Sequence, residues 1–305
     1  NINWEEGNNI IYISANDSAG NKNSSSVTFN IDTIYPTFSG YLESPSNNTQ
    51  YYPGQIIKFN STITNSNGTA IFQIRSNNYT ASNISLTSYN VTISGLSVGN
   101  YLYNFSSYGN GTLKKFNYST TRDYTISKNS TLVLGITGTT PLTYGQTTNV
   151  AGSGCPTQLS CALDKANAIY PAGTTFFNYS TAGNLNYSAS SINISIIINQ
   201  NNSLVRTYLN NSRANITIGQ GDKINLNGTI ITGEGNVTLY INGTKINSSL
   251  VEVYNLYNFT AVGTHNITAI HSATTNYTIG SETWYVTVSD TINPQVTINY
   301  PTNLS

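Results

Sequence analysis

The sequence predicts an all-β protein, and three features of its composition lead to that prediction. Asn, Ser and Thr dominate, with 46 Asn and 78 Ser plus Thr among 305 residues, whereas the helix-forming residues Leu, Ala, Glu and Lys are sparse. The 23 Tyr and the frequent β-branched residues are typical of strands. Hydrophobic residues make up 38% of the chain, which is enough to fill packed cores and excludes general disorder.

Four segments share a strand–turn–strand pattern that begins at a glycine. Polar residues alternate with apolar or aromatic residues in each strand, which predicts four β-hairpins. The pattern recurs every 74 to 92 residues, the spacing of a tandem array. The strand pairs are 7–15 with 26–31, 99–105 with 123–126, 173–179 with 192–196, and 263–267 with 283–288.

Two similar linkers mark domain boundaries. They are residues 32–36, with the sequence DTIYP, and residues 290–294, with the sequence DTINP. Proline after a strand ends the hydrogen-bond ladder and stiffens the linker. We therefore expect the C-terminal half of a domain at 1–36, complete domains at 37–127, 128–199 and 200–289, and a linker with the first strand of a further domain at 290–305.

Further alternating strands occupy the interior of each expected domain. Their apolar positions include Ile57 and Phe59, then Leu132, Leu134 and Ile136, then Ile224, Leu226, Val237, Leu239 and Ile241. Some seven short strands in roughly 75 to 90 residues is the pattern of an immunoglobulin-like β-sandwich. The predicted fold class is therefore all-β, with tandem immunoglobulin-like β-sandwich domains in an extended array.

Two stretches carry a resemblance to a known family. Residues 15–21 (ANDSAGN), with residues 27–29 and the linker at 32–36, resemble the terminal hairpin of bacterial and archaeal immunoglobulin-like surface repeats. Residues 179–188 and 152–161 are similar to archaeal versions of these modules. The resemblance covers most of the chain. It implies a secreted surface protein, such as a filament subunit, a cell-envelope layer protein or an adhesin.

The acceptor pattern Asn-x-Ser/Thr occurs 26 times, about twice as often as chance would give. In a strand, its Asn and hydroxyl residue share one face while the middle residue points to the other. We expect N-glycosylation, although the alternation of an Asn-rich and Thr-rich β protein also generates such triplets. The candidate acceptors are Asn16, Asn23, Asn60, Asn78, Asn90, Asn104, Asn178, Asn193, Asn215, Asn236, Asn258, Asn266 and Asn276.

Cys155 and Cys161 flank a Pro-containing turn and are the two cysteines of the chain. They predict a small disulfide loop, which an extracellular compartment permits. A zinc site would need two further ligands nearby, and none is visible in the sequence around them. The expected localisation is extracellular or at the cell surface.

Other chemistry finds little support in the sequence. His265 and His271 lack a nucleophile or carboxylate nearby, so we expect them to be structural. Five acidic residues lie near the expected domain junctions, but each junction offers one or two carboxylates at most, too few to bind calcium. The abundant tyrosines fit packing within strands better than a platform for carbohydrate. We expect no catalytic residues, no metal, no cofactor and no enzymatic activity. The acidic residues are Glu5, Glu6, Asp17, Asp32 and Asp290.

Charge and hydropathy limit the expected partners. The 12 Lys plus Arg balance 12 Asp plus Glu, so the chain has no net positive charge to attract the phosphates of a nucleic acid. The longest apolar run, Ile196 to Ile198, is far shorter than the roughly 18 residues of a membrane span. The expected partners are therefore other copies of the chain and covalent N-glycans.

The two ends of the sequence hold only parts of domains, and a lone hairpin or strand is unstable in water. Either neighbouring residues of a longer array complete them, or an end strand of one subunit completes the next, as in donor-strand polymers. We expect a structural subunit joined head-to-tail, with an adhesin or stalk that binds carbohydrate or protein as the alternative. The expected assembly residues are Val296, Thr297, Ile298, Ile11, Ile13, Val27 and Phe29.

Overall fold

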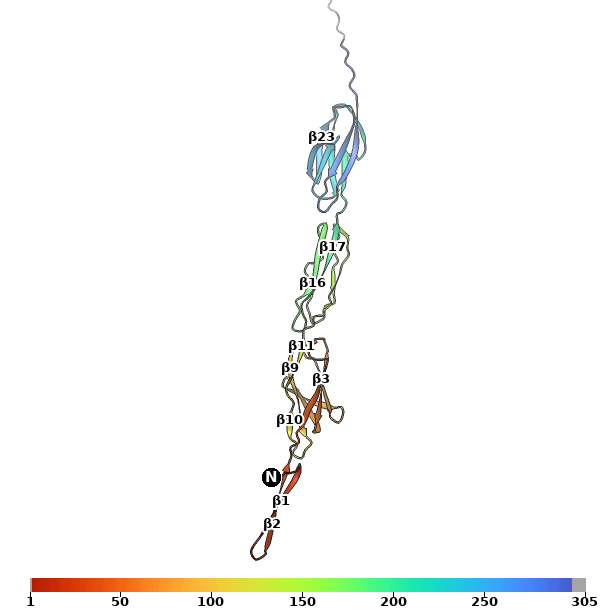
Figure 1. Cartoon of the computed structure of the whole chain (residues 1–305). Helices are drawn as coiled ribbons and strands as arrows, with labels where there is room; N and C mark the ends of the chain where they lie inside the picture. The colour runs from red at the N-terminus through yellow and green to blue at the C-terminus, as the bar shows by residue number, and fades with distance from the viewer. Residues whose placement is uncertain (1, 298–305) are drawn as a thin grey trace, which may run out of the picture. The chain divides into compact units, whose positions relative to one another are not determined.

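The computed structural model describes residues 2–297, and within that range every regular element is a β-strand (Figure 1). The predicted all-β fold is confirmed. The chain divides into two compact units. One comprises Asn1–Val133, Gly154–Cys161 and Thr181–Ser190, and the other comprises Leu134–Ser153, Ala162–Ser180 and Ser191–Ser305. We call residues 37–127 the first segment, 128–199 the middle segment and 200–289 the third segment.

The first segment is a sandwich whose two layers are joined along one edge. One layer consists of β3 (Thr37–Ser44), β5 (Ile56–Thr64) and β8 (Ser88–Ser94). The other runs in the order β7 (Asn77–Asn83), β6 (Ser66–Ile74), β9 (Gly99–Gly109), β11 (Arg122–Ser127) and β4 (Thr49–Gln50), with β10 (Phe116–Tyr118) paired to β9. Strand β7 also pairs with β8 and so joins the layers. Phe59, Phe72 and Phe105 are fully buried between them.

The third segment has two separate sheets. The first sheet contains β18 (Leu204–Leu209), β20 (Lys223–Thr232) and β23 (Glu252–Asn258). The second runs β19 (Ile216–Gly219), β25 (Gly280–Ser289), β24 (Gly263–His271), β21 (Asn236–Ile241) and β22 (Thr244–Leu250), with β19 parallel to β25. The last two strands, β24 and β25, form the hairpin that closes the segment, and this closing hairpin lies in the middle of the second sheet. Two sheets arranged in this way form an immunoglobulin-like sandwich.

The middle segment is a shorter version of the same arrangement. Strands β12 (Gly135–Thr137) and β14 (Ala151–Ser153) form one sheet. Strands β13 (Leu142–Thr143), β17 (Ser190–Asn199), β16 (Gly173–Thr181) and β15 (Ala162–Leu163) form the other. Its core is small and centres on Phe177, Ile196 and Ile198. At Gly152, an added Cβ would lie 2.4 Å from the Tyr179 ring, so only glycine allows this close approach.

The four predicted hairpins correspond to β1 (Gly7–Asn16) with β2 (Lys22–Ile31), β9 with β11, β16 with β17, and β24 with β25. The predicted alternation also places the expected side chains in the cores. Leu132 and Ile136 are exceptions, because they are only half-buried. The buried positions are Ile57, Phe59, Leu134, Ile224, Leu226, Val237, Leu239 and Ile241.

The strand expected near the C-terminus is not formed where the structure describes it. Residues 295–297 form no strand with any residue in the range 2–297. The rest of that expected strand, including Ile298, lies outside the described residues. The expectation of a further domain there stays a prediction.

One carboxylate links the two sheets of the third segment. Glu282 on β25 accepts a hydrogen bond from the Thr207 backbone N–H on β18 at 2.5 Å, and it forms an ion pair with Arg213. Burial by itself raises the pKa of Glu282, but the hydrogen bonds from Arg213 and Thr207 outweigh burial and hold it below its usual value. The ionised carboxylate therefore stabilises the sandwich above the ordinary Glu pKa and loses this effect as the pH falls.

We predict that Glu282→Gln lowers the free energy of unfolding by about 1–2 kcal/mol near pH 7, and that the deficit disappears near pH 3. Trp284 fluorescence during urea unfolding, in a Trp4→Phe background, reports this segment alone because the chain has 2 Trp. Glu5→Gln, at an exposed carboxylate, is the control. An equal deficit at both pH values would contradict the prediction.

Candidate functional site

The N-terminal hairpin has one apolar face. Ile11 and Ile13 on β1 share this face with Val27 and Phe29 on β2, and Ile11 lies directly opposite Val27. Trp4 packs edge-on against Phe29, with ring centroids 4.7 Å apart. The rest of the face is open, since Ile13 is 62% and Val27 is 57% exposed.

The closing hairpin of the third segment shows what such a face normally does. Its glycine start matches that of β1, so Ile267 and Ala269 correspond to Ile11 and Ile13, and Val286 corresponds to Phe29. Ile267, Ala269 and Val286 are completely buried within the sandwich. The hairpin β1–β2 therefore has the core face of a closing hairpin, and no sheet of the described chain is paired with its strands.

The remaining expected assembly residues lie after the third segment. Val296 is 83% exposed, Thr297 is also exposed, and neither lies in a strand. Ile298 lies outside the described residues. Their role in assembly stays a prediction.

A joint connects the first segment to the closing loop of the middle segment, inside the first compact unit. Asn186 lies in the loop between β16 and β17, and its Oδ1 accepts a hydrogen bond from the Val98 backbone N–H at 3.1 Å. The neighbouring Tyr187 ring packs edge-on against the Tyr51 ring, with centroids 5.7 Å apart. The linker residue Asn129 holds this loop through two backbone hydrogen bonds of 2.9 Å.

The same joint is built again inside the second compact unit, between the middle and third segments. Asn276 Oδ1 accepts a hydrogen bond from the Ala172 backbone N–H at 3.0 Å, and the Tyr277 ring packs edge-on against Tyr144 at 5.4 Å. The linker residue Asn201 makes the two matching backbone hydrogen bonds, of 2.8 and 2.9 Å. The motif Asn-Tyr-Ser/Thr in a closing loop thus forms an interdomain contact twice, a role that our sequence reasoning missed.

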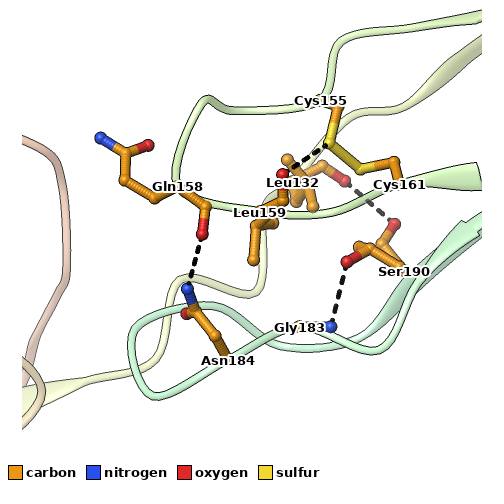
Figure 2. The surroundings of a disulfide bond; sticks show 9 residues. Leu132, Cys155, Gln158, Leu159, Cys161, Gly183, Asn184 and Ser190 are labelled. Atoms are coloured by element: carbon orange, nitrogen blue, oxygen red, sulfur yellow. Dashed lines mark hydrogen bonds between the residues drawn. A yellow bond between two sulfur atoms is a disulfide. The ribbon is translucent and has the colours of Figure 1, made fainter.

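The predicted disulfide between Cys155 and Cys161 is present and supports the first joint. Figure 2 shows its loop beside the loop that joins β16 to β17. Asn184 Nδ2 donates to the Gln158 carbonyl within the disulfide loop at 3.0 Å. Asn184 Oδ1 in turn accepts from the backbone N–H of Asn186 at 2.8 Å. The disulfide loop therefore holds the loop that carries the joint.

Glu234 and His271 support the second joint instead. Glu234 Oε1 accepts from Asn276 Nδ2 at 3.1 Å and from the Thr274 hydroxyl at 3.0 Å. His271 is completely buried and hydrogen-bonds to the Glu234 carbonyl and to Ser203 Oγ. His265 bonds to Asn242 and to a backbone carbonyl, so both histidines have structural contacts.

The expected acidic residues mostly organise turns and linkers. Asp32 is buried, and its carboxylate accepts hydrogen bonds from the backbone N–H groups of Ile34 and Leu113. Asp290 makes the matching bond to the Ile292 N–H at 3.0 Å, and Asp17 caps its own hairpin turn. Glu6 binds Thr33, whereas Glu5 is exposed. Among residues 2–297, no three His, Cys, Asp or Glu side chains lie together as a metal site would require.

Two tyrosines of the first segment, Tyr124 and Tyr103, have raised pKa values. Burial raises the pKa of Tyr124 to about 12, and its hydroxyl donates to the Pro45 carbonyl. Burial likewise raises the pKa of Tyr103, whose hydroxyl donates to Glu43. For these two tyrosines burial is the largest cause of the shift, in agreement with the packing role expected of most tyrosines.

The 13 candidate glycosylation acceptors are all at least partly exposed. The Asn104-Phe105-Ser106 triplet has the expected geometry, because Phe105 is fully buried while Asn104 and Ser106 point outward. Asn276 differs from the others, since both atoms of its amide are engaged in the second joint. A glycan on Asn276 would replace one hydrogen of the Nδ2 that donates to Glu234. Occupancy of every acceptor stays a prediction.

No protein-family model matches the chain, and a search of curated proteins found no match. Solved structures of tandem β-domains are similar at low identity. The fibronectin(III)-like modules of Clostridium thermocellum CbhA share 10% identity, with a TM-score of 0.24 over 87% of this chain and 100% of that chain. Sidekick-1 immunoglobulin domains 1–5 share 10% identity, with a TM-score of 0.31 over 92% of this chain and 66% of that chain. The I9–I11 tandem of titin shares 11% identity, with a TM-score of 0.25 over 78% of this chain and 94% of that chain.

Strand order and the burial of alternate residues assign the fold. Within residues 2–297, no helix is long and apolar enough to cross a membrane.

The joint between the first and middle segments protects the linker next to it, where Asn129 is buried and Lys128 is exposed. We predict that Tyr187→Ala raises the rate of trypsin cleavage after Lys128 roughly three- to tenfold, because it removes an aromatic pair from the joint. Tyr277→Ala, the equivalent change in the other joint, should leave this rate unchanged. Mass spectrometry of timed digests measures both. Equal acceleration by the two variants would contradict a local joint.

The disulfide closes a short loop, so its effect on stability should be modest. We predict that the double variant Cys155→Ser, Cys161→Ser lowers the stability of the middle segment by about 2 kcal/mol through the greater entropy of its unfolded state. Faster hydrogen exchange in β16 and β17, with unchanged exchange in β24 and β25, would show this. Unchanged exchange in β16 and β17 would contradict it.

Proposed function

We propose that this chain is a non-enzymatic structural segment of a glycosylated array outside the cell. The observation that carries the proposal is the open apolar face of the hairpin β1–β2. It repeats the core face of the complete segments, and an exposed face of this kind requires a covering sheet. A further stretch of polypeptide then completes each terminal domain and joins one unit to the next.

Fully burying an exposed Val or Ile side chain stabilises a protein by about 1.5–3 kcal/mol, and on this face of the hairpin Ile13 and Val27 are exposed while Ile11 and Phe29 are half-buried. An isolated two-stranded sheet has little stability of its own in water. Covering Ile11, Ile13, Val27 and Phe29 is therefore strongly favourable, whether the covering strands belong to the same polypeptide or to another copy.

The two joints support a mechanical role. Each places an aromatic pair and a side-chain hydrogen bond between consecutive segments, so the linkers are not the sole connection. The Asp32 and Asp290 turns extend this regularity, because both linkers form the same local hydrogen bond. Repeated contacts at repeated positions are the expected construction of a load-bearing series of domains.

The surface chemistry supports an extracellular location. Only 8% of the residues are charged, so another means of hydration is needed, and glycans attached to exposed strand faces would supply it. Glycans would also hinder pairing between sheet edges. The Cys155–Cys161 disulfide is compatible with an oxidising compartment.

A second candidate function is an adhesin or stalk that binds carbohydrate or protein. The observation that favours it is a groove on the outward face of the first segment, lined by aromatic and amide side chains. This function and the structural role can coexist in one chain.

Electron microscopy of the purified chain tests assembly. We predict fibres with a regular axial repeat, and we predict that Ile11→Ser with Phe29→Ser abolishes them because the apolar face no longer attracts a covering strand. Tyr12→Ser, on the opposite face of β1, is the matched control and should leave the fibres intact.

Dispersed monomers at high concentration, with the hairpin ordered, would contradict assembly between copies. Fibres that persist in the double variant would show that the hairpin face is not the contact.

A further inference from the structure

We propose that the first segment carries a binding site for neutral carbohydrate. The site is a groove of about 500 Å³ on the outward face of β7, β6, β9 and β10. We call it the aromatic groove; its lining residues are Ile71, Gln73, Asn78, Asn104, Ser106, Tyr108, Phe116 and Tyr118. The proposal does not rest on assembly into an array.

Strand register places three amide side chains in one row across the groove. Gln73 on β6 lies directly opposite Asn78 on β7 and directly opposite Asn104 on β9. Directly paired residues share a face of the sheet, so all three side chains point outward together. An amide offers both donors and an acceptor, and a row of three can bind several hydroxyl groups of one ligand.

The amide row is free to bind a ligand. Within residues 2–297, no hydrogen bond engages the side-chain amides of Gln73, Asn78 or Asn104, although many other Asn side chains of the chain are bonded in turns. The neighbouring row adds hydroxyl groups, because Ile71 lies between Thr80 and Ser106.

Aromatic rings form one wall of the groove. Tyr108 lies opposite Phe116 in the β9–β10 pairing, with ring centroids 5.1 Å apart. Tyr118 lies opposite Ser106 and extends the wall. Tyr108 is 46% exposed, Phe116 is 49% exposed and Tyr118 is 67% exposed. The aromatic residues of the core beneath them are buried.

The combination fits a sugar ring that carries no charge. A pyranose has an apolar C–H face, which can stack on an aromatic ring, and a rim of hydroxyl groups, which amides bind. None of the eight lining side chains is charged, so the groove has no counter-charge for an ionic ligand. Arg75, in the adjoining hollow, is held by Tyr101 through a hydrogen bond of 2.6 Å and a cation–π contact of 4.0 Å.

The sugar can come from two sources, because Asn78 and Asn104 begin the acceptor triplets Asn78-Tyr79-Thr80 and Asn104-Phe105-Ser106. A glycan attached to either Asn would start inside the groove and lie against its aromatic wall. A free oligosaccharide, or one carried by another molecule, would bind the same rings and amides in the unglycosylated chain.

The first experiment uses the full chain made without glycosylation. Maltoheptaose, cellohexaose, mannopentaose and chitotetraose are each titrated to about 10 mM, and affinity follows from the side-chain amide signals of Gln73, Asn78 and Asn104. We expect saturable shifts with at least one sugar. Tyr118→Ala or Tyr108→Ala should weaken binding about tenfold, since each removes a stacking ring. Tyr254→Ala, an exposed tyrosine of the third segment, should have no effect.

The second experiment uses the glycosylated chain and measures nuclear Overhauser contacts between sugar protons and the ring protons of Tyr108, Phe116 and Tyr118. Contacts that Asn104→Gln or Asn78→Gln removes identify the attached glycan as the ligand. Binding in the first experiment identifies a free sugar. Absence of both results would overturn the proposal. A response only to an anionic probe, a heparin hexasaccharide, or only to an extended peptide would also overturn it.

Discussion

Each of the four hairpins that begin at a glycine has one apolar face, and covering that face is the constraint on which the structure depends. In the third segment the face of β24 and β25 is buried by the opposite sheet, and Ile267 and Val286 are removed completely from water. The hairpin β1–β2 repeats the pattern without such a sheet among the described residues. One physical requirement therefore connects the buried cores of the complete segments with the open apolar face of the hairpin β1–β2.

The loops that close these hairpins perform the second task, which is connection. Because a closing loop lies at the end of its sandwich, its side chains can reach the neighbouring segment. Asn186 and Asn276 use one amide oxygen each for this purpose, and the following tyrosine adds an aromatic contact. The loops need support of their own, which comes from a disulfide loop in one case and from Glu234 in the other.

The outward faces of the sheets differ in chemistry even though their backbones are alike. Most present Asn, Ser and Thr, which are hydrated without charge and can carry glycans. The face around Tyr118 adds aromatic rings to the amides and is hollowed into the aromatic groove. A structural role and a binding role can thus share one domain, because the core fixes one side of each strand and leaves the other side free to vary.

The sequence by itself determined the four hairpins and most of the core residues, because an alternation of period two is a local property that decides which side of a strand is buried. Phe59 and Leu239 were predictable for that reason. Cys155 and Cys161 are close in sequence, so their disulfide was predictable as well. Only the tertiary structure showed that Asn276 spans a joint, because its partner Ala172 is 104 residues away in the chain. It also showed that Asn78, Gln73 and Asn104 form one row, because the row depends on the register of β6 against the distant strand β9.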